Sequence, residues 1–264
     1  MGDLVVPDGG ARPDGPARRG RVVAVVPLRD GSSGKSRLAH VLDPAARSRL
    51  IAVLARHVVR TLLASDGVER VVVVTSDPRF TWRALRDVVV DESADAAEAD
   101  GLPLLTDEAD RLRIVLQPAD RPGLDAAVDV GREIAASDTV EGAMDRRPLR
   151  LLVAHADLPA LTTADVAALL AEDAPVVVAT DRLGAGTNLL ALDPRASASF
   201  RFRFGPGSRA AHVAEAERLG LRAVVVQRPG TAVDLDTVED WGELPAGARA
   251  AVGLHVPALR DHDA

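Results

Sequence analysis

The sequence predicts an α/β fold, a three-layer sandwich in which helices cover a mainly parallel β-sheet. Apolar, β-branched runs such as "RVVAVVPL" (21–28) and "ERVVVVTSD" (69–77) are typical of strands buried on both faces. Segments with helical spacing of apolar residues alternate with these runs, as they do in parallel sheets with crossover helices. The chain has 264 residues, 47% of them hydrophobic, which is enough for a substantial core.

Strands are predicted where a short apolar run is bounded by turn residues. A third run follows near "RDVVVD" and a fourth at "RLRIVLQP", whereas "LRLLVAHADLP" ends in a polar turn. The stretch 174–193 reads as two strands joined by a glycine turn. In chain order the predicted strands cover 21–28, 69–77, 86–91, 111–118, 149–159, two segments of 174–193, and 221–230.

Helices are predicted from apolar stripes and from residues suited to helix ends. Asp43 is suited to the N-cap position and Pro44 to the first helical position. Thr162 can cap a second helix, and Gly220 can end another as a C-cap. The predicted helices cover 43–65, 123–136, 162–172 and 207–220, with a short one inside 233–244.

The chain is predicted to contain one folded domain with two flanking segments. Residues 1–20 are rich in Gly, Pro, Arg and Asp and are predicted to be a disordered leader. The domain covers 21–245, and residues 246–264 are predicted to be a loose C-terminal tail. The acidic, Ala-rich stretch 92–110 is predicted to be an insertion or an exposed loop.

Composition excludes several classes of function. The net charge is −7, with no block of like charge, which argues against a nucleic-acid surface but permits a small anion pocket. The absence of cysteine excludes disulfides and thiolate metal sites. No apolar run reaches the ~20 residues of a membrane span, and the N-terminus lacks the apolar stretch of a signal peptide. We therefore expect a cytoplasmic protein with neither nucleic acid nor membrane as a partner.

The loop "RDGSSGKSRLAH" (29–40) leaves the first strand and contains Lys35, the only lysine of the chain. A P-loop requires a glycine where Arg29 stands, so this loop is not a P-loop. A compact ammonium fits between phosphate oxygens where a planar guanidinium does not. We therefore expect Lys35 and Arg37 to contact phosphates. The alternative is a surface turn in which the lysine has survived by chance.

Carboxylates follow two other predicted elements. Asp157, in "HADLP", ends a buried strand, where a carboxylate is costly unless it meets a cation or capping amides. Asp234 and Asp236, in "VDLDT", point to the same side of an extended chain. Aspartate is a suitable Mg²⁺ ligand, since this ion takes one or two carboxylates together with substrate phosphates. The alternative for Asp236 is that it caps the helix beginning at Thr237.

Two glycine turns complete the candidate sites. The Gly-Pro-Gly-Ser turn at 205–208 precedes a predicted helix, whose free amides, together with Ser208, suit a phosphate or a carboxylate. Ser208 could equally be an ordinary N-cap. The turn "RLGAGTNLL" contains Thr187 and could equally be a plain hairpin. His155 and His212 could act as acid–base groups, but we interpret them as polar residues without a catalytic role.

Six segments in order resemble one family: "KSRLAHVLDPAARSRLIAVLARHVV", "GLDAAV", "ADLPAL", "DRLGAGTNLL", "RFGPGS" and "VDLDTVEDW". They are similar to the 2-phospho-L-lactate / phosphoenolpyruvate guanylyltransferases of coenzyme F-420 biosynthesis. The resemblance covers about residues 21–245 and implies a nucleotidyltransferase domain there. It implies a GT-A-like fold of nucleotide-diphospho-sugar transferase type, similar to that of the molybdenum-cofactor guanylyltransferases. It further implies that a phosphate oxygen of the acceptor attacks the α-phosphorus of GTP and releases pyrophosphate.

The resemblance also implies roles for individual residues. Two basic residues would hold the triphosphate of GTP, two aspartates would bind Mg²⁺, and a third aspartate would meet the guanine. Three further residues would receive the phosphate of the acceptor. In that order these are Lys35 and Arg37; Asp157 and Asp236; Asp125; and Thr187, Gly205 and Ser208. The family tends to have Asn in place of Asp125 and commonly Gly in place of Ala156.

The acceptor is not determined by the motifs. An Arg- and Ala-rich composition indicates a GC-rich genome, in which the resemblance favours phosphoenolpyruvate. 2-Phospho-L-lactate and 3-phosphoglycerate stay open, as does a homodimer. The product would pass to a downstream transferase. One alternative is a GT-A sugar transferase that uses "DLD" as its metal motif, although the chain is poor in the aromatic residues that usually bind sugars. The other is an inactive nucleotide-binding module.

Overall fold

The computed structural model describes residues 21–29, 34–90, 105–137 and 149–262. The predicted leader (1–20) and most of the acidic stretch 92–110 lie outside the described residues. Within these ranges one seven-stranded sheet has the order β3-β2-β1-β4-β6-β5-β7. Strand β6 runs antiparallel to β4 and β5, and the other neighbouring pairs are parallel. The predicted α/β fold with a mainly parallel sheet is confirmed.

Apart from the segment 86–91, the strands follow one another along the chain as the apolar runs predict. The strands are β1 (Arg21–Leu28), β2 (Val68–Thr75), β3 (Leu112–Leu116), β4 (Leu149–Ala154), β5 (Val176–Ala179), β6 (Leu189–Leu192) and β7 (Ala223–Val226). The α-helices are α1 (Pro44–Leu63), α2 (Pro78–Val89), α3 (Leu124–Ser137), α4 (Thr163–Ala171), α5 (Pro194–Ser197), α6 (Ser208–Arg218), α7 (Val238–Glu243) and α8 (Ala246–His255). Short 3₁₀ helices are η1 (Ser36–Leu38), η2 (Ala109–Arg111), η3 (Pro229–Thr231) and η4 (Pro257–His262).

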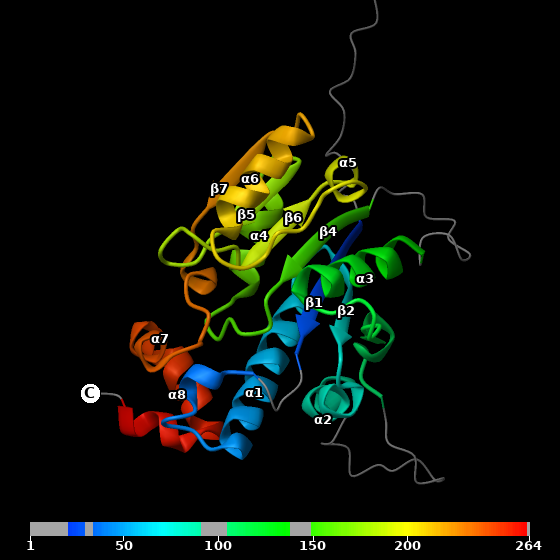
Figure 1. Ribbon diagram of the computed structural model, residues 1–264. Helices are drawn as coiled ribbons and strands as arrows, with labels where there is room; N and C mark the ends of the chain where they lie inside the picture. The colour runs from blue at the N-terminus through cyan, green and yellow to red at the C-terminus, as the bar shows by residue number, and fades with distance from the viewer. Residues whose placement is uncertain (1–20, 30–33, 91–104, 138–148, 263–264) are drawn as a thin grey trace, which may run out of the picture.

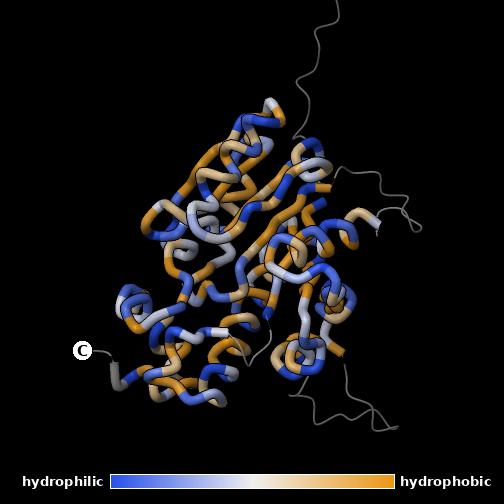
Figure 2. Tube along the Cα trace, in the orientation of Figure 1, coloured by the Kyte–Doolittle hydropathy of each residue, from blue (hydrophilic) through white to orange (hydrophobic). Residues whose placement is uncertain are grey.

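Helices cover both faces of the sheet (Figure 1). Because successive side chains of a strand point to opposite faces, Ala24 and Val26 of β1 pack toward α1, α2 and α4, whereas Val23 and Val25 pack toward α3, α5 and α6. Figure 2 shows the resulting pattern, with apolar strands inside and mixed helices outside. No helix among the described residues combines the length and the apolar character needed to cross a membrane.

Helix α3 lies unusually close to the central strand. A Cβ atom at Gly131 would lie 2.4 Å from Cγ1 of Val25, so only glycine permits this approach. The contact fixes the height of α3 above the sheet. As a result the N-terminus of α3, at Leu124, lies near the carboxyl end of β1, where a ligand of such a sheet binds.

Helix ends follow the predicted capping residues. The Asp43 side chain accepts a hydrogen bond from the N–H of Ala46, and Pro44 begins α1. Thr162 caps α4 in a capping box with Asp165. These local signals are confirmed because they require only neighbouring residues.

The strand predicted at 86–91 is wrong. Residues up to Val89 belong to α2, whose first turn is capped by Asp77 through a 2.9 Å hydrogen bond from the N–H of Phe80. The valines are buried as part of the inner face of this helix. Only Val90 makes a strand-like contact, an isolated bridge to Leu105. The Asp-Pro pair at 77–78 matches the pair that starts α1 and was the signal for this helix.

The predicted loose tail is also wrong, because residues 246–262 form α8 and η4. Val252, Val256 and Leu259 are buried in one cluster with Trp241 and with Leu50 of α1. This cluster lies on the side of α1 that faces away from the sheet, so α1 is covered on both sides. A short amphipathic segment folds here because a partner surface is already present.

We expect Leu259→Ala to lower the free energy of unfolding by about 2–5 kcal/mol, because Leu259 is fully buried. Leu254→Ala, at a side chain that is 71% exposed on the neighbouring helix, is the matched control and should change it by less than about 0.5 kcal/mol. Urea denaturation measures both. Equal effects of the two substitutions would show that the C-terminal helices do not belong to the cooperative core.

Candidate active site

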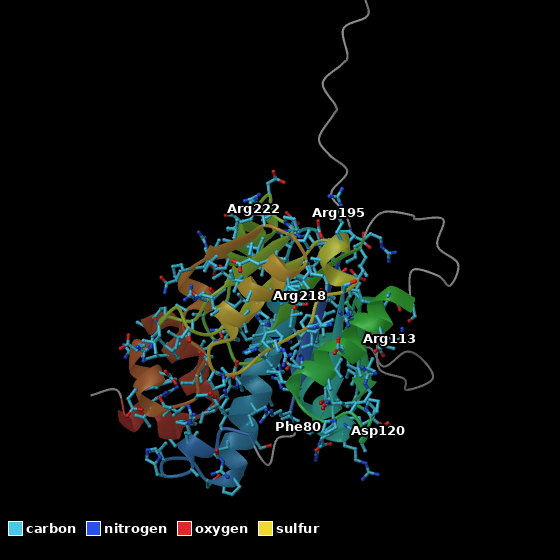
Figure 3. All side chains as sticks on the ribbon, turned by 45° about the horizontal axis from the view of Figure 1, so that its top comes forward. Phe80, Arg113, Asp120, Arg195, Arg218 and Arg222 are labelled. Carbon is cyan, nitrogen blue, oxygen red and sulfur yellow. The ribbon has the colours of Figure 1, made fainter. Side chains whose placement is uncertain are left out.

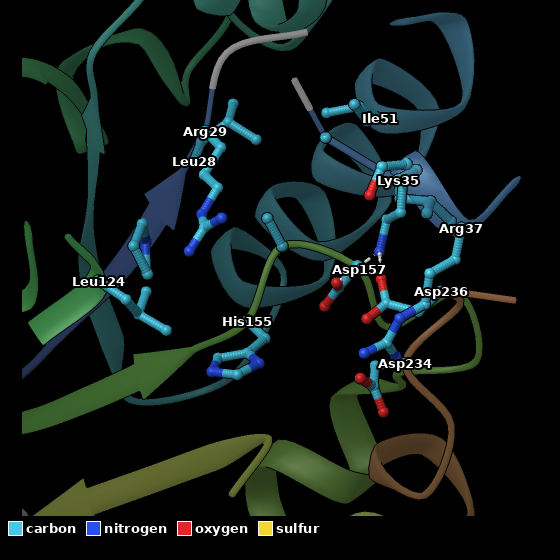
Figure 4. Close-up of a pocket in the computed structure, with 15 residues that line it drawn as sticks. Leu28, Arg29, Lys35, Arg37, Ile51, Leu124, His155, Asp157, Asp234 and Asp236 are labelled. Atoms are coloured by element: carbon cyan, nitrogen blue, oxygen red, sulfur yellow. Dashed lines mark hydrogen bonds and ion pairs between the residues drawn. The ribbon is translucent and has the colours of Figure 1, made fainter. Parts of the chain in front are cut away.

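A cavity of about 420 Å³ opens at the carboxyl ends of β1 and β4 (Figure 4). Residues from six separate segments line it: 27–29 at the end of β1, 34–37 at the start of η1, 51 and 54 of α1, 124 of α3, 155–157 after β4, and the aspartates at 234 and 236. Arg195 and Arg222, by contrast, lie at the opposite end of the sheet (Figure 3). The cavity is therefore at the sheet edge where ligands of this fold class are expected.

Lys35 is the central cation of the cavity. Its Nζ atom donates to Oδ2 of Asp157 at 2.6 Å and to Oδ1 of Asp236 at 2.7 Å, and its side chain is only 7% exposed. Burial lowers the pKa of Lys35, but the charges and hydrogen bonds of the two carboxylates outweigh it and raise the pKa above its ordinary value. Lys35 therefore stays charged.

The backbone of Lys35 is held in an uncommon conformation. Its φ of 55° and ψ of 38° are left-handed, and within the described ranges it is the one non-glycine residue with positive φ. Such a conformation costs free energy in an ordinary residue and is found mostly at functional sites. Here it turns the side chain from the start of η1 back toward the strand ends. The preceding loop residues 30–33 lie outside the described residues.

Asp157 lies in the turn just after β4, three residues beyond its last residue, Ala154. Its carboxyl Oδ1 atom is buried and has no hydrogen-bond partner among the described residues. Burial by itself would raise the pKa of Asp157. The charges of Lys35 and His155 and the hydrogen bond from Lys35 lower it by more, so the net shift of the pKa is downward. The carboxylate thus stays ionised and keeps one oxygen available for a cation or a donor.

The "VDLD" segment is tied to the end of β4 by a hydrogen bond from the N–H of Leu235 to the carbonyl of Asp157. This bond places Asp234 and Asp236 in the cavity wall, on the same side as predicted. Asp236 does not cap the following helix, since the N-cap of α7 is Thr237, whose hydroxyl accepts from the N–H of Asp240. Burial and the charge of Asp157 raise the pKa of Asp234.

Arg37 and Arg29 also line the cavity, on separate walls. Figure 4 shows the Arg37 side chain reaching toward Asp234, whereas Arg29 lies on the other side of the cavity with Leu124 and His155. A second cavity, of about 600 Å³, shares residues 27–29 and Leu124 with the first and continues toward the ends of β2 and β3. The two form one continuous cleft.

The residues predicted to receive the acceptor's phosphate lie together but do not line the first cavity. The N–H of Ser208 donates to the carbonyl of Gly205, and the next amide donates to Ala185 in the turn that contains Thr187. Thr187 and Ser208 are buried. The hydroxyl of Thr187 is bonded to Nδ1 of His212 at 3.0 Å.

His212, in α6, forms hydrogen bonds to the segments that contain Thr187 and Arg203, and these bonds fix the tautomer of its ring. Its Nε2 accepts the N–H of Arg203 at 3.1 Å and must therefore be unprotonated, so Nδ1 carries the hydrogen and donates it to Thr187. Burial, with the nearby charge of His155, lowers the pKa of His212 to about 4. The neutral ring is a structural tie of the fold.

Asp125 and His155 have surroundings that the sequence did not indicate. Asp125, predicted to meet guanine, accepts the N–H of Phe204 at 2.8 Å. His155, interpreted as a plain polar residue, lines the cavity, and its Nε2 is buried without a hydrogen-bond partner among the described residues. The available signal was its place two residues before Asp157, which is the strand end that meets the site.

The carboxylates fit a divalent cation that arrives with phosphates. Asp157 and Asp236 both point at one position, which the Lys35 ammonium holds. No group of three His, Cys, Asp or Glu side chains in the described part of the chain could hold a metal by itself. Two carboxylates completed by substrate oxygens are the usual donor set of Mg²⁺. The residues therefore fit Mg²⁺ carried by a nucleotide.

Comparison with solved structures defines the class of fold. A protein from Desulfovibrio desulfuricans G20 assigned as a nucleotide-diphospho-sugar transferase matches with a TM-score of 0.60 at 14% identity, over 92% of this chain and 98% of the other. A nucleotidyl transferase from Methanothermobacter matches with a TM-score of 0.54 at 20% identity, over 91% and 99%. The chain has the nucleotide-diphospho-sugar transferase fold.

Sequence comparison is more specific. A family described as "Guanylyl transferase CofC like" matches residues 105–248. A phosphoenolpyruvate guanylyltransferase from Rubrobacter xylanophilus is 38% identical, over 85% of this chain and 94% of its own. One from Chloroflexus aggregans is 33% identical, over 86% and 98%. The chain belongs to the CofC-like guanylyl transferase family.

We expect the free energy of unfolding to depend on pH through His212. The ring has a pKa of about 4 in the fold against an ordinary 6.5, so its contribution to stability is complete above pH 6.5. It is lost as the pH falls toward 4, by about 1.4 kcal/mol per pH unit. His212→Gln should remove this slope in urea denaturation series, whereas His255→Gln, at an exposed ring, should keep it. Parallel profiles for wild type and His212→Gln would contradict this role.

Proposed function

We propose that this chain transfers GMP from GTP to phosphoenolpyruvate in coenzyme F-420 biosynthesis and releases pyrophosphate. The observation that carries the proposal is the Lys35 ammonium between Asp157 and Asp236, inside the cavity of a chain that belongs to a guanylyl transferase family. Relatives that match most of this chain are phosphoenolpyruvate guanylyltransferases, which supports that acceptor. A site that combines two partly exposed carboxylates with a buried, fixed cation suits phosphoryl chemistry, which depends mainly on positioning and charge neutralisation.

The cleft divides into places for the two halves of GTP. Lys35 and Arg37 lie where a triphosphate would meet them, and the second cavity provides a wall of Pro, Leu and backbone groups for a base. The volume of that cavity, about 600 Å³, is sufficient for a nucleoside. In this arrangement Lys35 leaves the carboxylates and binds phosphate oxygens.

Asp157 and Asp236 would hold Mg²⁺ together with the phosphates of GTP. When bound, the ion would neutralise charge on the transferred phosphoryl group. The unpartnered Oδ1 of Asp157 supports this assignment, because a buried carboxylate oxygen without a donor is available to a cation. The low pKa of Asp157 keeps it ionised for this purpose.

The reaction joins two anions. A phosphate oxygen of phosphoenolpyruvate forms a bond to the α-phosphorus of GTP, and the bond from that phosphorus to the bridging oxygen of the β-phosphate breaks. Pyrophosphate leaves with the electron pair, and the product contains a new phosphoanhydride. The cationic groups in the cavity would hold the two phosphates in line and offset their mutual repulsion. The reactive product would pass to a downstream transferase.

Pyrophosphate release tests this proposal. The wild-type chain with GTP, Mg²⁺ and phosphoenolpyruvate should release pyrophosphate, and ATP or CTP in place of GTP should not support it. Asp157→Asn and Asp236→Asn should each lower kcat/KM by about 100-fold or more, because each removes a charge from the cation position. Asp43→Asn, which changes only a helix cap, should stay near wild type.

If pyrophosphate were released with 2-phospho-L-lactate or 3-phosphoglycerate but not with phosphoenolpyruvate, the proposed acceptor would be wrong. GTP binding without release for any acceptor would contradict the enzyme and indicate a binding protein.

Cation binding should depend on the nucleotide. Electron paramagnetic resonance with Mn²⁺ should show weak binding to the wild-type chain alone, because Lys35 occupies both carboxylates. Addition of a GTP analogue with a non-cleavable α–β bridge should tighten Mn²⁺ binding by about 10-fold or more. The phosphates of the analogue would accept hydrogen bonds from the Lys35 ammonium and ligate the ion. Lys35→Met should bind Mn²⁺ without nucleotide, and Asp157→Asn should bind it poorly in both conditions. Tight binding to wild type without nucleotide would contradict the competition between Lys35 and the cation.

A further inference from the structure

The backbone of segment 200–205, between α5 and α6, does not pair with a strand among the described residues. Three of its N–H groups donate to side chains instead. The N–H of Arg201 donates to Oε1 of Glu215 at 2.9 Å. The N–H of Arg203 donates to Nε2 of His212. Both partners belong to α6, so these bonds join the segment to the helix that follows it.

The third side-chain bond comes from the other side of the cleft. Oδ1 of Asp125, in the first turn of α3, accepts the N–H of Phe204 at 2.8 Å. The two residues are 79 positions apart in the chain. This bond therefore joins the segment to a helix that is itself held tightly on β1 by the close approach of Gly131 to Val25.

Phe204 is in contact with the cavity wall. Its ring centroid lies 5.3 Å from that of His155, which lines the cavity. On its other side it meets the ring of His212 edge-on at 4.7 Å, and His212 is bonded to Thr187. The next residue, Gly205, opens the turn that leads into α6 with φ of +113°. A displacement of Phe204 would thus move both a cavity wall and this turn.

The residue next to Asp125 faces the nucleotide side. Leu124 lines both cavities, so the first turn of α3 meets the proposed place of GTP through Leu124 and the segment before the proposed acceptor turn through Asp125. Asp125 itself is absent from the lining of either cavity. Asp125 therefore lies behind the cavity wall, and one of its oxygens accepts a backbone N–H. It supports the wall and does not touch a ligand.

We propose that Asp125 is a positioning residue for the acceptor, acting through the backbone of Phe204 on His155 and on the 205–208 turn. The inference rests on the proposed function, since it names which of the two substrates the residue serves. It replaces contact with guanine as the role of Asp125. An amide side chain retains an oxygen that can accept the same N–H, whereas alanine leaves this amide without its partner.

Steady-state kinetics with Asp125→Ala and Asp125→Asn test the proposal. Asp125→Ala should raise KM for phosphoenolpyruvate by roughly 10-fold, as loss of a charged hydrogen bond would, with KM for GTP within about 2-fold of wild type. Asp125→Asn should restore KM for phosphoenolpyruvate to within about 3-fold of wild type. Asp43→Ala removes a carboxylate that accepts a backbone N–H at 2.7 Å in α1, and it is the matched control, with both KM values unchanged.

Hydrogen exchange supplies a second readout that requires no turnover. Amides of peptides covering 200–208 should exchange faster in Asp125→Ala than in wild type or Asp125→Asn, while α1 and β4 peptides stay as in wild type. Unchanged exchange there would overturn the inference. So would a rise in KM for GTP alone, which would indicate contact with guanine. Failure of the wild-type chain to release pyrophosphate would count against the proposed function instead, and the exchange result would still decide the structural role.

Discussion

The structure depends on one buried interaction, the ammonium of Lys35 between the carboxylates of Asp157 and Asp236. Its partners stand 122 and 201 positions away in the chain, so it joins the start of the domain to its middle and its end. Two short charge-assisted bonds offset the cost of burying the ammonium, and removal of either carboxylate would leave the charge of Lys35 only partly compensated. The strained backbone at Lys35 indicates that the surrounding fold imposes this geometry.

The topology of the sheet explains why the interaction forms where it does. Strand β1 lies between β2 and β4, with α1 on one face and α3 on the other, so a crevice opens at its carboxyl end. The loops after β1 and β4 meet there, and the bond between Leu235 and Asp157 brings the C-terminal aspartates to the same place. The C-terminal helices pack against the side of α1 that faces away from the sheet and support this helix from outside.

The two sides of the cleft are built differently. On the side proposed for the nucleotide, charged groups line a cavity, and one oxygen of Asp157 has no hydrogen-bond partner among the described residues. On the other side, polar side chains such as His212 form hydrogen bonds to backbone amides and to Thr187. These bonds support the irregular segment 200–205. Open, charged groups suit ligand binding, whereas neutral and satisfied groups give the wall its shape.

The sequence by itself determined the class of fold, the caps of α1 and α4, and Lys35, Asp157 and Asp236 as candidate site residues. Buried strands and caps such as Asp43 depend on local patterns, and a lone lysine and a carboxylate at a strand end are conspicuous in composition alone. Tertiary structure decided the rest. The valines at 88–90 are equally apolar in a strand and on the inner face of α2, and only packing separates the two. The C-terminal helices form because α1 offers them a surface, and the partner of Asp125 lies across the cleft, where no sequence spacing reveals it.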